Sequence, residues 1–124
     1  MWINVLIVGA GSFVGGALRY LVSVAMRGVG GGFPWATLTV NIVGSLAIGL
    51  LYGLFARYAS VSHSACLLLT TGLCGGFTTF STFSNEALTM LQSGNIGSFA
   101  GYVSLSLLGG LAAVMVGTWL ARIA

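Results

Sequence analysis

Four long apolar runs dominate this sequence, and they leave the chain few folds to choose from. The runs cover approximately residues 2–26, 34–55, 64–91 and 96–121, with short connections between them. About 20 apolar residues are enough for a helix to cross the hydrocarbon core of a bilayer. Only 4% of the 124 residues are charged, whereas soluble domains carry roughly 25%. The sequence therefore predicts an all-α membrane protein, a single domain with four transmembrane helices.

The few charged residues bear on orientation in the membrane. All the cations are arginines. With four spans, Arg57 and Arg122 fall on one side of the membrane and Arg27 on the other, so the arginine excess that orients membrane proteins is nearly absent. Insertion in both orientations is therefore plausible, and two opposite copies could pair as an antiparallel dimer. A nucleic-acid partner is not indicated, because the chain has no basic patch.

The third run contains an unusual segment, GLCGGFTTFSTFSNE at residues 72–86. Its adjacent glycines, Gly75 and Gly76, are expected to interrupt the helix, and a second half-helix is expected to start near Thr79. Irregular backbone at membrane depth is tolerated only where it is buried in protein or lines a cavity. The carbonyls freed by a break can bind a cation, and the N–H groups of a restarting helix attract an anion.

Phe80 and Phe83 follow the predicted break and are three residues apart, which places both rings on one face of a helix. The edge of an aromatic ring is its positive part. Ring edges beside hydroxyls and an amide can therefore hold a small anion without a full positive charge. A kinked helix with core phenylalanines is the simpler alternative, but the combination of break, hydroxyls and rings favours a pore or an ion-binding site.

Polar and small residues recur every four positions on the other runs and mark one face of each predicted helix. Asn41 lies on this face of the second run, and Tyr102 and Ser106 lie on that of the fourth. Close packing of helices explains the glycines on these faces. For the three polar residues, helix packing and contact with a solute both remain open.

Arg19 and Glu86 are the charged residues that fall inside the runs. Because a charge inside a membrane is costly, Arg19 is expected to reach the interface, to pair with Glu86, or to attract anions in a vestibule. Glu86 is the only acidic residue, and no second carboxylate or Ser-His arrangement accompanies it. Acid–base catalysis lacks its residues, so the sequence does not indicate an enzyme.

Three segments together resemble one family, the Fluc (CrcB) fluoride channels. They are GSFVGGALRY at 11–20, ATLTVNIVGS at 36–45 and TTGLCGGFTTFSTFSNE at 70–86, of which the third is long and distinctive. The resemblance covers nearly the whole chain. It implies an antiparallel, dual-topology homodimer in the lipid bilayer of the bacterial inner membrane. Two pores would passively export cytoplasmic fluoride, and a structural Na⁺ would lie at the dimer centre.

The resemblance also implies roles for individual residues. Arg19 is expected in a vestibule, and the backbone carbonyls of Gly75 and Thr78 are expected to hold the Na⁺. The fluoride pore is expected to be lined by Asn41, Phe80, Ser81, Thr82, Phe83, Tyr102 and Ser106.

The sequence departs from the family pattern in two places. Residue 36 is alanine where glycine is expected, which is a detail of packing. Gly110 and Val114 stand where members of the family often carry another hydroxyl. The outer part of the polar face on the fourth helix therefore lacks its expected groups.

Two other functions compete with a fluoride channel. A small, dual-topology, proton-coupled multidrug exporter would also be short and have four spans, but it needs a membrane-embedded glutamate as its coupling site. Glu86 follows the predicted break, and the first run contains no acidic residue. A non-transporting anchor or assembly subunit would explain the small-residue faces but not the polar break.

Overall fold

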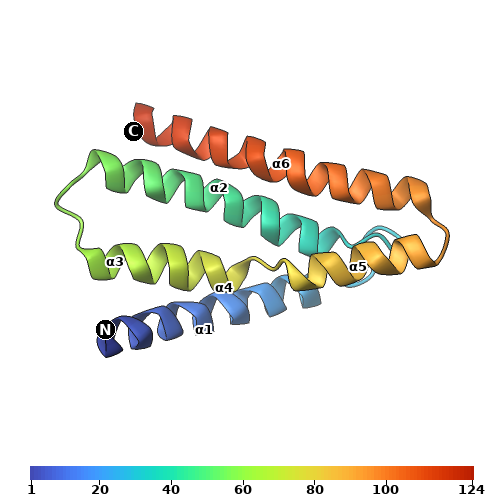
Figure 1. The fold of residues 1–124 in the computed structure, drawn as a ribbon, viewed down its shortest axis with the longest axis horizontal. Coiled ribbons are helices and arrows are strands. Elements are labelled where there is room, and N and C mark those ends of the chain that lie inside the picture. The colour runs from blue at the N-terminus through green and yellow to red at the C-terminus, as the bar shows by residue number, and fades with distance from the viewer.

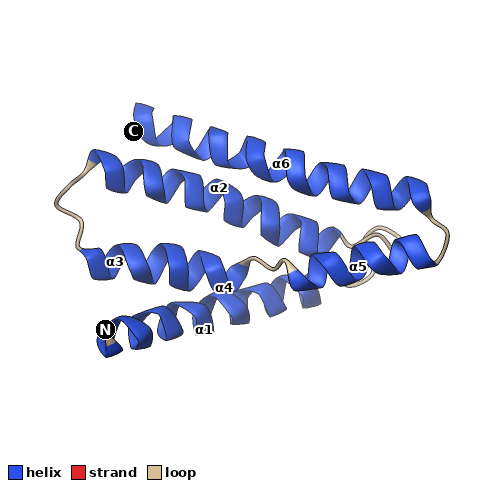
Figure 2. Ribbon diagram, viewed as in Figure 1, coloured by secondary structure: helices blue, strands red, loops and turns tan.

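A computed structural model describes all 124 residues of the chain, which forms helices and connecting loops and no strands (Figure 2). Helix α1 covers Trp2–Ala25, α2 covers Trp35–Arg57, and α6 covers Ile96–Ile123. The third span, His63–Gln92, is divided into several segments. Each of these four spans, the third taken as a whole, is long and apolar enough to cross a membrane. The expectation of an all-helical chain with four such helices is confirmed.

The spans lie side by side and reverse direction at each loop (Figure 1). Helices α2 and α6 pack against each other and end at the same side of the molecule. There Arg57 Nη1 donates hydrogen bonds to the carbonyl oxygens of Ala121, at 3.1 Å, and Arg122, at 2.8 Å. The last carbonyls of a helix have no partner within it, so Arg57 both caps α6 and joins it to α2.

Glycines bring α1 into direct contact with the backbone of the third span. A Cβ atom on Gly11 would lie 2.5 Å from the carbonyl oxygen of Leu68 and 2.8 Å from the nitrogen of Leu73. A Cβ atom on Gly76 would lie 2.7 Å from the carbonyl oxygen of Ser12. Small residues allow membrane helices to approach this closely, and here they hold α1 beside the first half of the third span.

The third span is not a uniform α-helix. Helix α3 (His63–Leu67) runs into a π-helical segment, η1 (Leu68–Cys74), and then into a short helix, α4 (Gly75–Phe77). Three non-helical residues follow before α5 (Ser81–Gln92) begins. Residues 78–80 are called the interruption below. π-Helical turns occur frequently at functional sites, and this one lies directly before the interruption.

The two glycines that were expected to break the helix are themselves helical. Gly75 has φ −63° and ψ −38°, which is right-handed helical geometry, and Gly76 belongs to the same short helix. Gly76 serves the close contact with α1 rather than a turn. The helix ends at Phe77, and the next residue, Thr78, is extended with φ −84° and ψ 161°. The second half-helix then starts at Ser81, later than the predicted start near Thr79.

A small buried core lies where α2, α5 and α6 meet. Leu38, Phe83, Ala87 and Tyr102 form its buried cluster, and Phe33 from the α1–α2 loop packs against them. The Tyr102 ring lies 5.1 Å from the Phe83 ring and 5.5 Å from the Phe33 ring, measured between centroids. This core fixes the first turn of α5, and with it one end of the interruption.

Candidate functional site

A groove of about 510 Å³ follows the interruption and is lined by residues of α2, the third span and α6. No charged side chain lines it. The predicted site residues in its lining are Asn41, Gly75, Thr78, Phe80, Phe83 and Ser106. An ion in this groove would therefore meet amide, hydroxyl and carbonyl groups and ring edges rather than formal charges.

The Asn41 side chain connects α2 to the interruption. Its Oδ1 accepts a hydrogen bond from the N–H of Thr79 at 2.8 Å, and its Nδ2 donates one to the carbonyl oxygen of Thr79 at 3.0 Å. One side-chain amide thus satisfies both backbone groups of a residue that lies outside any helix. Nδ2 carries two protons, so one remains available to another acceptor.

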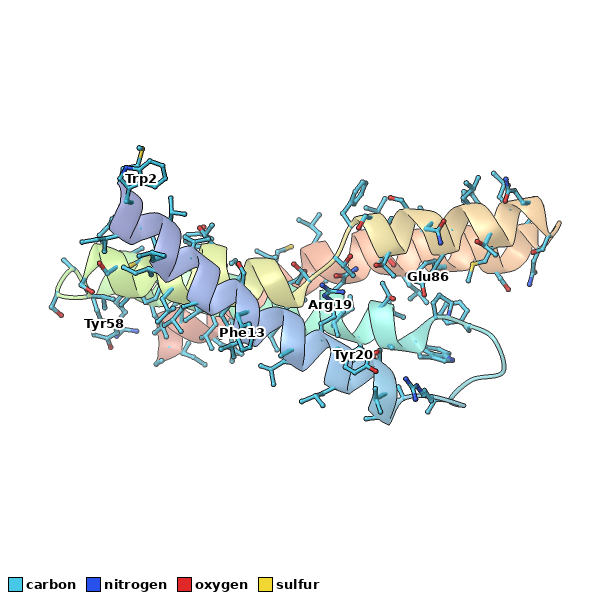
Figure 3. The ribbon with its side chains drawn as sticks, turned by 90° about the horizontal axis from the view of Figure 1, so that it is seen from below. Trp2, Phe13, Arg19, Tyr20, Tyr58 and Glu86 are labelled. Carbon is cyan, nitrogen blue, oxygen red and sulfur yellow. The ribbon has the colours of Figure 1, made fainter.

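Arg19 extends from α1 to α4, next to the interruption (Figure 3). Its Nε donates a hydrogen bond to the carbonyl oxygen of Gly76 at 3.2 Å. Arg19 does not pair with Glu86, whose Oε1 instead accepts a hydrogen bond from the Tyr102 hydroxyl at 3.0 Å. Of the three arrangements expected for Arg19, the structure therefore does not form the ion pair with Glu86.

A second cavity, of about 200 Å³, lies beside Arg19. Its polar lining comes from α1, α2, the interruption and α5, and consists of Arg19, Tyr20, Ser23, Thr37, Thr79 and Thr82. A guanidinium group among hydroxyls is suited to attract an anion, as a vestibule would require. Thr79 lines both cavities, so the interruption contributes to each of them.

Phe80 and Phe83 differ in how they are held. The Phe83 side chain is 9% exposed and belongs to the core, whereas the Phe80 side chain is 76% exposed and borders the groove. Their ring centroids lie 5.9 Å apart with an angle of 45° between the planes. One ring is therefore fixed by packing within the chain, and the other projects outward.

The other predicted pore residues are distributed between the groove and its surroundings. The Ser106 hydroxyl lies in the groove lining, is buried, and has no hydrogen-bond partner. Tyr102 is fully buried in the core. Thr82 lines the second cavity, and Ser81 is exposed and lines neither cavity. A single chain thus brings together only part of the predicted pore.

Several residues of the groove were not among the predicted site residues. Thr79 is predicted from the sequence only as the approximate start of the second half-helix. In the structure its hydroxyl accepts a hydrogen bond from the backbone of α5, and its own backbone is the partner of Asn41. Ser45 follows Asn41 by four residues on the same face of α2, and this spacing could have indicated it. Thr70 and Thr71 lie in the π-helical segment, which no spacing pattern in the sequence predicts.

Backbone oxygens are the candidate cation ligands of this site. No group of three or more His, Cys, Asp or Glu side chains is placed to hold a metal ion. The carbonyl oxygens of Gly76 and Thr79 are occupied by the side-chain donors described above. Those of Gly75 and Thr78 accept no hydrogen bond from loop backbone or from a side chain, and both residues line the groove.

Comparison with known proteins shows the family of this chain. Residues 6–118 match the family described as CrcB-like protein, Camphor Resistance (CrcB). The chain belongs to the CrcB family. Among its CrcB relatives, a protein of Chlorobaculum tepidum is 48% identical over 120 residues, covering 97% of this chain and 95% of that protein. A protein of Agrobacterium fabrum is 48% identical over 121 residues and 97% of each chain.

A third CrcB relative, from Chlorobium luteolum, is 44% identical over 115 residues, which are 93% of this chain and 89% of that protein. All three relatives are named fluoride-specific ion channel FluC. The family resemblance inferred from the three sequence segments is confirmed. An ion channel is not a class of enzyme, in line with the absence of an acid–base pair in the sequence.

Proposed function

We propose that this CrcB-family chain is a fluoride-selective channel that passively exports cytoplasmic fluoride and so protects the cell from fluoride toxicity. The names of its relatives support this function. The observation that carries it is the uncharged groove, in which Asn41, Phe80 and Ser106 meet beside the interruption. These are neutral groups that can approach an anion closely.

Fluoride is small and strongly hydrated, so a pore must replace its water with donors at short range and still release the ion. The groove offers the Ser106 hydroxyl, the second Nδ2 proton of Asn41, and the edges of the two phenylalanine rings. All of these are dipoles, and none carries a full positive charge that would trap the anion. Arg19, in the second cavity, would raise the local anion concentration without lying in the groove.

A second copy in the opposite orientation would complete the pore. In one chain the groove is open, and hydroxyl and amide groups facing lipid would lack partners, which is costly in a bilayer. The exposed Phe80 ring at its border would be covered by such a copy. Near-equal arginine content at the two ends of the molecule, with Arg27 at one and Arg57 and Arg122 at the other, fits dual topology. The bacterial relatives support a location in the inner membrane.

A Na⁺ ion is the cation that this site would take at the dimer centre. The Gly75 and Thr78 carbonyls fit it, because they are unoccupied hard oxygen donors at the end of a helix in the membrane, as in transporters with discontinuous helices. Once bound, Na⁺ would supply a fixed positive charge between the two copies. The chain's own contribution is to end α4 where it does and to leave these two oxygens free.

The exporter alternative is not favoured. The single glutamate, Glu86, does not line the groove, and its Oε1 is engaged by Tyr102. The relatives are named as channels for fluoride. An anchor without transport activity would likewise give no reason for an uncharged groove with an unpartnered hydroxyl.

Growth in fluoride tests the function in cells. A bacterium without its own fluoride export, expressing this chain, is expected to grow at fluoride concentrations that stop cells with an empty vector. Phe80→Ile is expected to abolish this tolerance because it removes a ring edge from the groove. Phe13→Ile is the matched control, since Phe13 is an exposed phenylalanine of α1 away from the groove.

Membrane levels of the three proteins would be compared by immunoblotting. Failure of the unaltered chain to protect the cells would contradict the proposed function. Full protection by Phe80→Ile at an equal protein level would contradict the role of that ring.

A further inference from the structure

Asn41 fixes the direction of two peptide units of the interruption. All peptide bonds of the chain are trans, and in a trans unit the C=O and N–H groups point in opposite directions. The Thr79 N–H points at Asn41 Oδ1, so the Thr78 carbonyl, which shares that peptide unit, points away from Asn41. By the same argument, the Thr79 carbonyl points at Asn41 and the Phe80 N–H points away.

The rest of Thr78 is held from the opposite direction. Its N–H and its hydroxyl both donate to the carbonyl oxygen of Cys74, at 3.1 Å and 3.0 Å. These bonds tie the N-terminal side of Thr78 to the preceding helix but leave rotation about its ψ angle free. The hydrogen bond from Thr79 to Asn41 is therefore the one that sets the orientation of the peptide between residues 78 and 79.

Side chains from two other helices divide the carbonyls of this region into two sets. Arg19 of α1 occupies the Gly76 carbonyl, and Asn41 of α2 occupies the Thr79 carbonyl. The Gly75 and Thr78 carbonyls remain unoccupied by loop backbone or side-chain donors. The two donors thus take the carbonyls of Gly76 and Thr79 and leave those of Gly75 and Thr78 without a side-chain donor.

We infer that Asn41 is a positioning residue for the cation site: by clamping Thr79 it aims the Thr78 carbonyl outward as a ligand. The inference rests on the proposed function, in which Na⁺ binds the Gly75 and Thr78 carbonyls. Asn41 would then have two roles, because its remaining Nδ2 proton is still available to donate to fluoride. The same side chain would orient a Na⁺ ligand and contact the transported fluoride.

Thermal unfolding of the purified dimer, measured against Na⁺ concentration, tests this inference without any flux. Ionic strength is kept constant by replacing NaCl with N-methyl-D-glucamine chloride. A ligand that binds only the folded state stabilises it by RT ln(1 + [L]/Kd), so the melting temperature of the unaltered protein is expected to rise with Na⁺. The Kd fitted to this dependence is the Na⁺ concentration that half-fills the site, and it is called the half-effective concentration below. Asn41→Ala is expected to shift the half-effective Na⁺ concentration upward by about tenfold or more, since the Thr78 ligand is no longer aimed.

Ser45→Ala is the matched control. Ser45 lies on the same face of α2 and lines the same groove, but it makes no hydrogen bond to the interruption. Its Na⁺ response is expected to equal that of the unaltered protein. A loss of packing alone would lower the melting temperature of Asn41→Ala at every Na⁺ concentration and leave the half-effective concentration unchanged.

Asn41→Asp keeps the inference testable if Asn41→Ala does not fold. The aspartate retains an oxygen that accepts from the Thr79 N–H, which is the bond that orients the Thr78 carbonyl, but it loses the donor to the Thr79 carbonyl. This variant is expected to keep a half-effective Na⁺ concentration close to that of the unaltered protein. Its fluoride efflux is expected to be slow, because a negative charge has entered the groove.

Three results would overturn the inference: an unshifted half-effective concentration in Asn41→Ala, a strongly weakened Na⁺ response in folded Asn41→Asp, or no Na⁺ response in the unaltered protein. The last result would remove the cation site but leave the channel in place if fluoride efflux is normal. Absent fluoride efflux together with a normal Na⁺ response would contradict the channel function and not the cation site.

Discussion

At the scale of the residue, the Ser106 hydroxyl is the clearest sign that one chain is incomplete. It is the only buried side-chain polar atom without a hydrogen-bond partner. Leaving a buried hydroxyl unsatisfied costs about 1–3 kcal/mol. A cost of this size at a groove lining is understandable if an ion or a second copy supplies the missing partner.

Replacement of this hydroxyl separates function from stability. Ser106→Ala is expected to leave the free energy of unfolding unchanged or to raise it by up to about 1 kcal/mol, because no hydrogen bond within the chain is lost. The melting temperature should therefore stay the same or rise slightly. Fluoride efflux is expected to slow. Ser104→Ala, at an exposed position of α6 outside the groove, should change neither property. A strong loss of stability with normal efflux would show that Ser106 is a structural residue.

At the scale of the element, hydropathy was sufficient to predict the four spans but not to predict the structure inside the third span. The long apolar runs located α1, α2 and α6 because a bilayer selects helices of that length. The Gly75-Gly76 pair indicated the right neighbourhood for the interruption, but these glycines remain helical and serve the contact with α1. The interruption itself depends on tertiary partners, which sequence spacing does not reveal.

The sequence likewise predicted some residues of the candidate site but not the hydrogen bonds that hold them. The four-residue spacing on α2 and α6 pointed to Asn41 and Ser106, which do line one groove. The two hydrogen bonds between Asn41 and Thr79, and the one that Arg19 donates to Gly76, join segments far apart in the sequence. Such pairings are set by how three helices pack together, so residue types alone could not identify them.

The glycine contact between α1 and the third span gives a sharp stability prediction. A Cβ atom on Gly15 would collide with the carbonyl oxygen of Leu73, whereas one on Gly16 would meet nothing within 4 Å. Gly15→Ala is expected to destabilise the fold by about 1–3 kcal/mol through overpacking. Gly16→Ala is expected to be neutral or slightly stabilising, because alanine is the better helix former.

Unfolding in detergent, followed by circular dichroism, would measure both variants. Equal melting temperatures for the two would mean that α1 can move away from the third span without cost. The packing that positions Arg19 beside the interruption would then be looser than the structure shows.

At the scale of the whole molecule, the nearly balanced arginines and the open groove lead to the same proposal of two oppositely inserted copies. Each copy would cover the polar lining of the other and meet it at the interruption. One chain supplies the groove and the free carbonyls, and a second would close the path around the ion. On this proposal, a single chain forms half of the channel.

Labelling from each side of the membrane tests dual topology. In a background of Cys66→Ala and Cys74→Ala, Ser60→Cys places one thiol in the loop between α2 and α3. A membrane-impermeant maleimide added outside intact cells is expected to label roughly half of the protein if insertion is unbiased. Labelling of nearly all or nearly none of the protein would show a single orientation and exclude the antiparallel homodimer.

Fluoride efflux from liposomes containing the purified chain tests the central claim most directly. A fluoride electrode and a chloride electrode would follow both ions after a potassium ionophore is added to balance the charge. The account predicts rapid loss of fluoride and retention of chloride. Equal loss of both anions, or no loss of fluoride from a folded dimer, would contradict a fluoride-selective pore built around Asn41, Phe80 and Ser106.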